Sequence, residues 1–262
     1  GNAYIKGAAA VPAGFPALID ELKRHAIAGA GQVREERAEA PPINDEAAWD
    51  GDRDDPYTST AGTAGSTSTG SAVANISYDA VFQEIERSVT SDPRLMLVAD
   101  TFLGIYLAAR IRMTGQNTFM AGAVWASIGH SVGAGTGVAA ANRKRPFIVC
   151  GDGGFQMIAQ SLSTMARFRL NAITVVIDNG LYGYEQYLLG RSYYSGTSGS
   201  PLPYAVLNDW DYVAVARALG ISQVARAATA SEFATAISAA KAQKGPAFIQ
   251  VSVGPRSLPA GL

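Results

Sequence analysis

The stretch Phe147-Ile148-Val149-Cys150-Gly151-Asp152-Gly153-Gly154 joins a run of apolar residues to a turn rich in glycine. A short apolar run is typical of a buried strand in a parallel sheet, where both faces are covered. The segment from Gln156 to Phe168 predicts a helix after this turn. The order of strand, glycine turn and helix places Asp152 at the carboxyl end of the strand and beside the N-terminus of the helix. Backbone N–H groups at a helix N-terminus favour the binding of a phosphate.

The alternation of strand and helix continues on both sides of this stretch. Further strands are predicted over residues 95–99, 173–177 and 247–251, and further helices over residues 78–89, 103–110, 129–141, 212–219 and 231–240. This alternation is typical of an α/β fold, with a mostly parallel sheet and helices on both faces. In such sheets ligands bind beyond the carboxyl ends of the strands.

The chain before residue 76 has a different character from the rest. Residues 1–28 predict a strand and a helix that cannot bury their apolar faces alone, so they resemble the end of a domain whose body lies elsewhere. A processed terminus is the alternative. Residues 29–75 combine an acidic segment with a run of Ser, Thr, Ala and Gly, and predict a flexible linker. Residues 76–262 are then the α/β domain.

The composition of the 262 residues argues against several classes of protein. With 21 basic and 22 acidic side chains the net charge is −1, which is unlike a nucleic-acid-binding protein. No run of about 18 apolar residues predicts a membrane span, and no signal peptide is visible, so a cytoplasmic location is expected. A single cysteine rules out a disulfide framework, and two histidines leave little room for a histidine-based metal centre.

A second polar residue is expected at the same edge of the sheet as Asp152. Asn179 follows the predicted strand 173–177, as Asp152 follows the strand that ends at Cys150. The carboxylate of Asp152 and the amide oxygen of Asn179 are therefore expected to lie close together. Mg²⁺ prefers such oxygen ligands, takes few of them from the protein, and adds phosphate oxygens and water. The residues alone thus favour a site for Mg²⁺ and phosphate.

A Gly-Asp-Gly turn followed by an asparagine 27 residues after the aspartate resembles the thiamine diphosphate motif. The resemblance implies a thiamine diphosphate-dependent enzyme, of which residues 76–262 are the domain that binds the diphosphate and Mg²⁺, in a thiamine diphosphate-binding fold. In that family the aspartate, the asparagine and one backbone carbonyl hold Mg²⁺, which here implies Asp152, Asn179 and Leu181. The family usually has Asn-Asn, whereas Asp178 precedes Asn179 here; the second position is the ligand.

A finer resemblance is to the pyruvate and indolepyruvate decarboxylases. It is carried by Gly151-Asp152-Gly153-Gly154-Phe155-Gln156-Met157, by Ser163-Thr164-Met165 and by Val124-Trp125-Ala126-Ser127-Ile128-Gly129. In those enzymes the residue matching Ile128 props the cofactor in a bent, reactive shape, and the residue matching Ala126 offers its carbonyl to the aminopyrimidine. The cofactor contacts that the resemblance implies are Asp152, Gly153, Gly154, Phe155, Asn179, Leu181, Tyr182, Ala126, Ile128 and Thr101.

The resemblance also implies a catalytic residue and a substrate pocket. Glu185 lies six residues after Asn179, where the decarboxylases have a glutamate over the thiazolium ring that handles protons around decarboxylation and aldehyde release. A carboxyl group in a closed, apolar site is expected to have a raised pKa and to act as an acid. Ile105, Tyr184 and Leu188 are expected to face the substrate side chain, and Tyr184 is larger than the usual isoleucine.

Two positions depart from the family pattern, and three weaker signals favour plain structural roles. Leu103 lacks the hydroxyl group found in the family's Thr-Gly-Thr/Ser diphosphate loop, and Gly154 replaces a common serine. Residues 133–137 lack the dinucleotide-binding spacing and predict close helix packing. Arg143-Lys144-Arg145 predicts a solvated turn before the next strand. Cys150 predicts a small buried hydrophobic residue.

The resemblance finally implies that this chain is half of an active site. The family's activating glutamate comes from a pyrimidine-binding domain, so a second chain or fragment carrying that domain is expected, in a dimer-of-dimers-type assembly. The expected reaction is the non-oxidative decarboxylation of a small 2-oxo acid to an aldehyde. A thiamine-diphosphate-dependent carboligase, acyloin- or acetolactate-synthase-like, and a non-catalytic cofactor-binding subunit remain alternatives. Neither a nucleic acid nor a membrane is expected as a partner.

Overall fold

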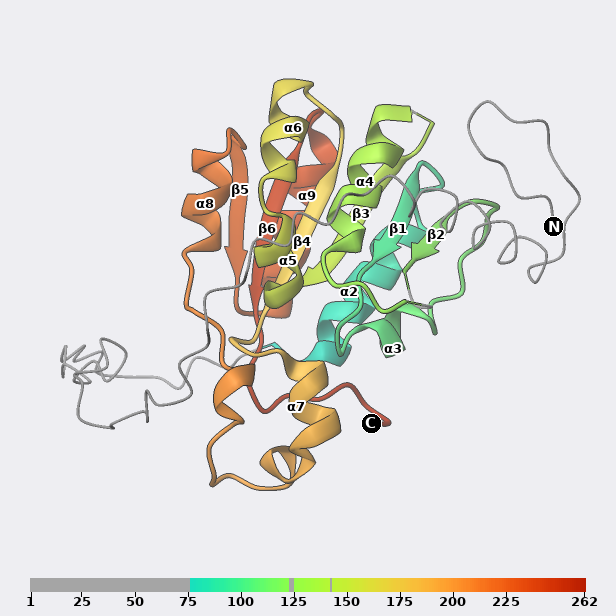
Figure 1. Ribbon diagram of the computed structural model, residues 1–262. Coiled ribbons are helices and arrows are strands. Elements are labelled where there is room, and N and C mark those ends of the chain that lie inside the picture. Colours follow the sequence, from blue (N-terminus) through green and yellow to red (C-terminus); the bar gives the residue numbers. More distant parts are fainter. Residues whose placement is uncertain (1–75, 123–124, 142) are drawn as a thin grey trace, which may run out of the picture. The chain divides into compact units, whose positions relative to one another are not determined.

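The computed structural model describes residues 76–122, 125–141 and 143–262, all within the second of two compact units, Thr69–Leu262. The predicted strand and helix of residues 1–28 and the predicted linker of residues 29–75 lie outside the described residues. The described part of the second unit is a sheet between two layers of helices (Figure 1).

The sheet has six strands, and every neighbouring pair is parallel. The strands are β1 (Leu95–Ala99), β2 (Phe119–Ala121), β3 (Arg145–Gly151), β4 (Ile173–Asp178), β5 (Gln223–Ala227) and β6 (Ala247–Ser252). Their order is β2-β1-β3-β4-β6-β5, with Ala99 opposite Val149 and Gly151 opposite Ile177. The carboxyl ends of β1, β3 and β4 therefore lie side by side. The predicted α/β fold class is confirmed, and the sheet is wholly parallel.

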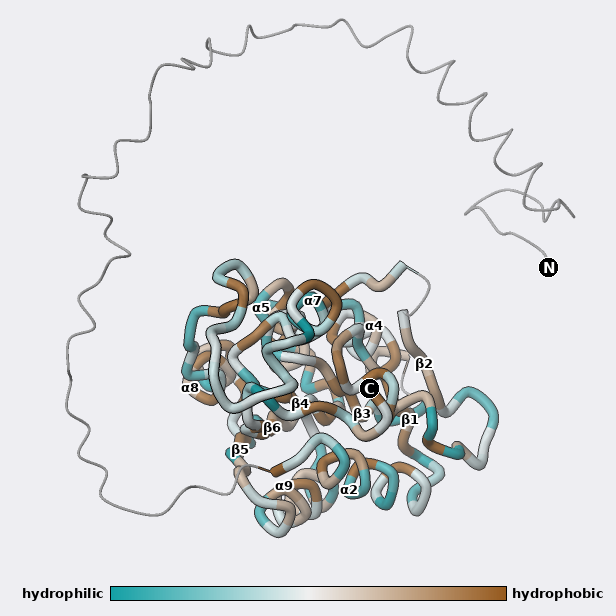
Figure 2. The backbone as a smooth tube through the Cα atoms, turned by 90° about the horizontal axis from the view of Figure 1, so that it is seen from below, coloured by the Kyte–Doolittle hydropathy of each residue, from teal (hydrophilic) through white to brown (hydrophobic). Residues whose placement is uncertain are grey.

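Helices cover both faces of the sheet (Figure 2). One face is covered by α2 (Tyr78–Thr90) and α9 (Ala230–Ala242), and the other by α4 (His130–Ala141), α5 (Asp152–Ile158), α6 (Ser161–Arg167) and α8 (Tyr212–Ala218). Beyond the carboxyl ends of the strands lie α3 (Ile105–Ala108), α7 (Gly183–Leu189) and two short 3-10 helices, η1 (Arg191–Ser195) and η2 (Pro203–Ala205). Within the described ranges, no helix is long and apolar enough to cross a membrane.

Each central strand is buried on both of its faces. Leu97 of β1 packs in the cluster that includes α2 and α9, and its neighbour Val98 packs in the cluster on the opposite face. In β3, Phe147 joins the first cluster, and Ile148 and Cys150 join the second. Successive side chains of a strand point to opposite faces, so a strand covered on both sides is apolar throughout. Cys150 is fully buried, which confirms the prediction that it is a small hydrophobic residue.

Two helices differ from the prediction. The helix predicted over residues 156–168 is divided into α5 and α6. α5 also starts earlier, at Asp152, because Gly151 has extended backbone and acts as its N-cap. The helix predicted over residues 103–110 shortens to α3, because Phe102 and Leu103 are buried in the turn that follows β1.

Besides the short 3-10 helices η1 and η2, three described elements have no counterpart in the sequence prediction. β2 has three residues, and β5 reads Gln223-Val224-Ala225-Arg226-Ala227, so neither contains a continuous apolar run. Both are edge strands, and pairing with β1 and β6 fixes their backbone. Strand formation at such edges depends on neighbouring strands more than on propensity. The third element, α7, carries most of its side chains half-buried or exposed, so it lacks a clear apolar face.

Residues 133–137 lie in α4, as the prediction of close helix packing requires. A Cβ atom added at Gly135 would lie 2.3 Å from Cδ1 of Ile148, whereas one added at Gly137 would meet nothing within 4 Å. We expect Gly135→Ala to lower the free energy of unfolding by about 1–3 kcal/mol through overpacking. We expect Gly137→Ala to raise it by about 0.5–1 kcal/mol, because alanine is the better helix former. Urea denaturation measures both, and equal effects would contradict the tight contact of α4 with β3.

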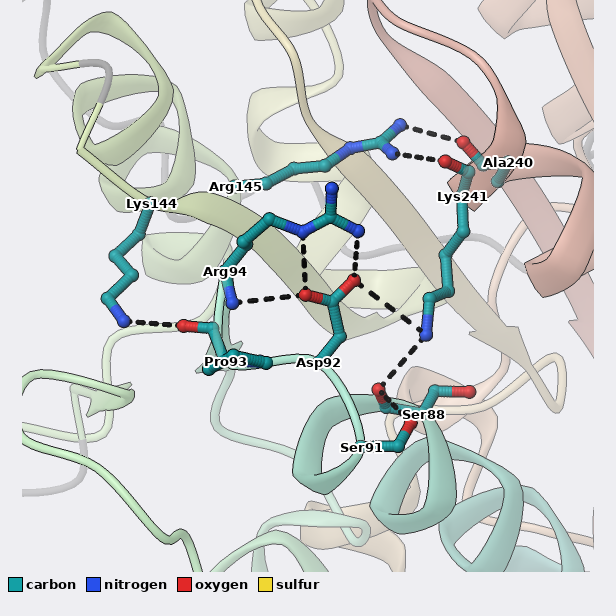
Figure 3. Close-up of polar contacts among 9 residues, drawn as sticks. All are labelled: Ser88, Ser91, Asp92, Pro93, Arg94, Lys144, Arg145, Ala240 and Lys241. Carbon is teal, nitrogen blue, oxygen red and sulfur yellow. Dashed lines mark hydrogen bonds and ion pairs between the residues drawn. The ribbon is translucent and has the colours of Figure 1, made fainter.

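A polar network lies at the N-terminal ends of the strands, opposite their carboxyl ends (Figure 3). One oxygen of Asp92 accepts hydrogen bonds from the backbone N–H and the Nε of Arg94, and the other lies 2.8 Å from Nη2 of the same guanidinium. Arg145 donates to two carbonyl groups in the last turn of α9. The predicted solvated turn is therefore wrong for Arg145, which is half-buried and whose charge complements the C-terminus of a helix.

The hydrogen bond from the Arg94 guanidinium lowers the pKa of Asp92 from 3.8 to about 2. Because this pKa is lower in the folded state, the ionised carboxylate stabilises the fold above about pH 4, and this contribution is lost as the pH falls towards about 2. Arg94 is exposed, so solvent screening reduces the expected effect to about 1 kcal/mol. Denaturation of the wild type and of Asp92→Asn across this pH range measures it. Parallel pH profiles of the two proteins would contradict the prediction.

Candidate functional site

Three strands that end side by side bring polar residues to one edge of the sheet. Asp100 follows β1, Asp152 follows β3 and Asn179 follows β4. In the order β2-β1-β3, the chain leaves β1 in one direction to form β2 and returns on the other side to form β3. Ligands of open α/β sheets bind in the crevice outside such a reversal of strand order. The position of these residues therefore favours a ligand site.

Asp152 joins two turns at this edge. Its carboxylate is 2% exposed and accepts hydrogen bonds from the backbone N–H groups of Gly153 at 2.9 Å, Asn179 at 3.0 Å and Gly180 at 2.7 Å. Burial, and then the charge of Asp178, raise its pKa to about 7, while the three backbone hydrogen bonds oppose this shift. A bound cation would favour the ionised carboxylate.

Asn179 and Leu181 complete the predicted set of Mg²⁺ ligands. Asn179 is 7% exposed, and its Oδ1 atom accepts a hydrogen bond from the backbone N–H of Leu181 at 3.2 Å. Leu181 also pairs with Val206 in an isolated antiparallel bridge. The structure thus joins Asn179 and the backbone of Leu181 in one turn and attaches that turn to the carboxylate of Asp152.

Asp178, which stands where the family usually has asparagine, has a partner of its own. Its Oδ2 atom accepts a hydrogen bond of 2.7 Å from Nε2 of Gln250, a buried residue of β6. The backbone carbonyl of Asp178 accepts a hydrogen bond from the N–H of Val253. The side chain is therefore engaged with β6, which explains how an aspartate is accommodated at this position.

The glycine turn at the start of α5 is closely covered. A Cβ atom at Gly153 would lie 2.5 Å from Cε1 of Tyr182, so the Tyr182 ring lies directly over the turn. A Cβ atom at Gly154 would lie 2.8 Å from Oδ2 of Asp100, which leaves no room for the serine common in the family. Phe155 is fully buried in the core, so only its backbone can contribute to a cofactor site.

The loop before α4 contains Ala126 and Ile128. Ala126 adopts φ = 51°, in the left-handed region, and its N–H donates to the carbonyl of Gly122 at 3.1 Å. Ile128 is half-buried, whereas Trp125 is 87% exposed. The N–H of Gly129 donates to Oδ2 of Asp100 at 2.8 Å. The loop is therefore attached to the same edge of the sheet as Asp152.

The residues present suit a diphosphate cofactor held through a cation. The Oγ1 atom of Thr101 is buried and has no hydrogen-bond partner among the described residues, so a hydroxyl donor is free at the end of β1. Asp152, Asn179 and Leu181 offer carboxylate, amide and peptide oxygens, the donor set that Mg²⁺ prefers. Among the described residues, no group of three or more His, Cys, Asp or Glu is arranged to hold a metal ion.

Two of the three predicted substrate-facing residues, Tyr184 and Leu188, lie in α7, and the third, Ile105, lies in α3. The Tyr184 hydroxyl lies 3.1 Å from that of Tyr106 in α3, and the two rings are stacked with centroids 6.1 Å apart. Ile105, the first residue of α3, is half-buried, and Leu188 is 60% exposed. The structure therefore brings Ile105 and Tyr184 to neighbouring elements, with Leu188 on the open side of α7.

Glu185 lies in the first turn of α7 and is half-buried. Burial, followed by the charges of Glu185 and Asp152, raises the pKa of Tyr182. Tyr182 therefore lies within electrostatic reach of the predicted catalytic carboxylate and of the predicted cation ligand. Glu185 is thus placed at the same edge of the sheet as the Gly-Asp-Gly turn.

Sequence reasoning missed Asp100, Tyr106 and Gln250. Asp100 follows β1 as Asp152 follows β3, so its place after an apolar strand was a usable signal. Tyr106 contacts Tyr184, which is 78 residues away in the chain, and Gln250 contacts Asp178, which is 72 residues away. No local pattern indicates contacts of this kind.

The fold and the edge site together define a class: an α/β domain suited to a phosphate-bearing cofactor held through a divalent cation. The family model for the C-terminal, TPP-binding domain of thiamine pyrophosphate enzymes matches residues 103–251, more than half of the chain. This chain therefore belongs to the thiamine pyrophosphate enzymes, whose cofactor is thiamine diphosphate under another name. The family predicted from the motif is confirmed.

The chain is similar in sequence to curated decarboxylases. It is 28% identical over 167 residues to the alpha-keto-acid decarboxylase of Mycobacterium bovis (strain BCG / Pasteur 1173P2), a match that covers 63% of this chain and 28% of that protein. It is 29% identical over 177 residues to pyruvate decarboxylase 3 of Oryza sativa subsp. japonica, covering 66% and 28% respectively. The chain spans less than a third of the length of these relatives.

Solved structures show the same fold. The thiamine diphosphate-dependent 4-hydroxybenzoylformate decarboxylase of Rhodococcus jostii RHA1 superposes with a TM-score of 0.60 at 20% identity, over 71% of this chain and 34% of that one. The benzoylformate decarboxylase of Polynucleobacter necessarius superposes with a TM-score of 0.58 at 23% identity, over 68% and 33%. At these identities the likeness concerns the fold alone.

Proposed function

We propose that this chain supplies the diphosphate- and Mg²⁺-binding half of the active site of a 2-oxo acid decarboxylase that releases an aldehyde. The observation that carries the proposal is the hydrogen bonding of the Asp152 carboxylate, in the glycine turn of α5, to the turn that contains Asn179 and Leu181. The matched family and the decarboxylase names of the relatives support it. Residues 76–262 are the proposed cofactor-binding domain.

Residues of this chain would bind the cation and the diphosphate of the cofactor. Asp152, Asn179 and the carbonyl of Leu181 would hold Mg²⁺ on the diphosphate, with Thr101, Gly153 and Gly154 around its oxygens. When bound, thiamine diphosphate supplies the carbon nucleophile and the electron sink for the loss of CO₂.

The remaining contacts concern the ring end of the cofactor and the substrate. Ala126 and Ile128 would shape the ring end, and Tyr182 would cover the turn. Ile105, Tyr184 and Leu188 would face the side chain of the 2-oxo acid. Glu185 would donate a proton at the former ketone carbon before the aldehyde leaves.

The other half of the active site is proposed to come from a second chain or fragment with the pyrimidine-binding domain. The support is that the chain matches only about a third of each solved relative, and that the family model it matches describes a C-terminal TPP-binding domain. The activating glutamate would come from that second chain or fragment, in a dimer-of-dimers-type assembly. A cytoplasmic location stays a prediction from the sequence.

The test is a substrate screen with the complete assembly, thiamine diphosphate and Mg²⁺. A panel of aliphatic and aromatic 2-oxo acids is incubated while CO₂ and the organic product are both measured. Release of CO₂ with an equal amount of aldehyde is the expected result. A 2-hydroxy ketone as the main product would identify a carboligase instead. Cofactor binding by calorimetry without turnover of any 2-oxo acid would identify a non-catalytic subunit.

A further inference from the structure

Asp100 is a buried carboxylate for which the proposed reaction has no use. It follows β1, is 1% exposed, and lies at the same edge of the sheet as Asp152. Burial raises its pKa, so placing a carboxylate here is costly for the fold. A negative charge at this edge would also repel a diphosphate, so Asp100 is poorly suited to contact the cofactor's phosphates. We therefore expect the role of Asp100 to lie in the hydrogen bonds that its carboxylate accepts from backbone N–H groups.

Both oxygens of Asp100 accept hydrogen bonds from backbone N–H groups. Oδ1 accepts from Thr101, the next residue, at 2.8 Å, and Oδ2 accepts from Gly129, 29 residues further along the chain, at 2.8 Å. The second bond is buried and joins the end of β1 to the loop of residues 125–129. A hydrogen bond to a charged acceptor is stronger than one between neutral groups. Asp100 is therefore an anchor for that loop.

The loop has a backbone that needs an anchor. Ala126 has φ = 51° and Gly129 has φ = 82°, so two residues of this short segment are in the left-handed region. For alanine this conformation is unfavourable, and it persists only where surrounding contacts impose it. Ile128 lies between the two and directly precedes the amide that Asp100 holds.

The anchor also fixes the loop against α5. A Cβ atom on Gly129 would lie 2.8 Å from the carbonyl oxygen of Gly154. A Cβ atom on Gly154 would lie 2.8 Å from Oδ2 of Asp100 and 3.0 Å from the N atom of Gly129. These three residues touch with no space for another atom. The absence of a side chain at Gly154 is what lets the carboxylate and the loop meet beside the Gly-Asp-Gly turn.

We infer that Asp100 is a positioning residue: it holds the loop of residues 125–129 against the glycine turn of α5 and so fixes where Ala126 and Ile128 stand relative to a cofactor bound there. The anchoring of the loop concerns the protein alone. The role towards the cofactor rests on the proposed function, because it takes this edge to be the thiamine diphosphate site. Asp100 acts through the Gly129 amide and does not itself touch the cofactor.

The test compares two buried carboxylates that flank the same strand. Asp92 precedes β1 and accepts a hydrogen bond from one backbone N–H group, whereas Asp100 follows β1 and accepts from two. Asp100→Ala and Asp92→Ala are both expected to lower thermal stability. Only Asp100→Ala is expected to speed hydrogen exchange of the amides of residues 125–131, by about tenfold or more, because one buried anchor is lost. Asp100→Asn keeps one acceptor oxygen, so an intermediate rate is expected, and this variant serves if Asp100→Ala does not fold.

Binding of thiamine diphosphate at saturating Mg²⁺, measured by calorimetry on the complete assembly, is the second readout. We expect Asp100→Ala to raise the Kd about tenfold or more and Asp92→Ala to leave it unchanged. Equal exchange of residues 125–131 in the two variants would overturn the anchor itself. Faster exchange with an unchanged Kd would overturn the role towards the cofactor. If the wild type binds no thiamine diphosphate while the exchange difference persists, the proposed function fails and the anchor stands.

Discussion

The Asp152→Ala variant is expected to lose the binding of thiamine diphosphate in the presence of Mg²⁺ and to be less stable than the wild type. The carboxylate is the charged ligand of the proposed cation site, and neutral oxygens alone hold Mg²⁺ poorly. It is also the common acceptor for the N–H groups of Gly153, Asn179 and Gly180. A buried donor without an acceptor costs about 1–3 kcal/mol, so the free energy of unfolding should fall by about 3 kcal/mol or more.

Calorimetric titration and urea denaturation measure the two effects of Asp152→Ala separately. Asp152→Asn keeps the shape and part of the hydrogen bonding but removes the charge, so it should lose affinity with a smaller loss of stability. Asp209→Ala removes an exposed carboxylate and is the matched control, for which neither quantity should change. Wild-type affinity in Asp152→Ala would refute the proposed Mg²⁺ site.

The Glu185→Gln variant, tested in the complete assembly, is expected to lose most of its turnover and keep its cofactor. Glutamine has nearly the same size but cannot donate a carboxylic proton. General acid catalysis by a positioned side chain contributes about 10²–10⁴-fold, so kcat for aldehyde release should fall by that factor. Because Glu185 is in α7 and outside the proposed Mg²⁺ ligands, the Kd for thiamine diphosphate should change little.

Steady-state kinetics with aldehyde detection tests the role of Glu185. Glu86→Gln makes the same chemical change at an exposed position of α2 and should leave kcat unaltered. A carboligase or a non-catalytic subunit would respond differently, since neither depends on proton transfer to release an aldehyde. Unchanged aldehyde release in Glu185→Gln would remove Glu185 from the mechanism.

The strands that hold the site were predictable because they are buried on both faces. The predicted strands 95–99, 173–177 and 247–251 correspond to β1, β4 and β6, and the quoted apolar run lies within β3. Continuous apolar runs of this kind are hard to accommodate elsewhere than in the centre of a parallel sheet. β5 shows the limit of this kind of prediction, because it contains Gln223 and Arg226 and has no continuous apolar run. Its backbone conformation is fixed by pairing with β6 and not by its composition.

The meeting of Asp152 with Asn179 followed from the sequence because both residues come directly after buried strands. Two such strands in one parallel sheet end at the same edge, and strands consecutive in the chain are usually neighbours, as β3 and β4 are, so the residues after them meet. The place of Arg145 did not follow in this way. A basic residue in a turn is usually solvated, and only the approach of the end of α9 gives its guanidinium two carbonyl acceptors.

The sequence by itself determined the α/β class, the central strands and the family, since each depends on residues close together in the chain or on a fixed motif spacing. Only the tertiary structure decided that Asp100, Gly129 and Gly154 form one junction. That junction requires β1 and β3 to be neighbours, with β2 on the far side of β1. Strand order depends on the packing of the whole sheet, so contacts between the loops at its edge cannot be derived from any local pattern.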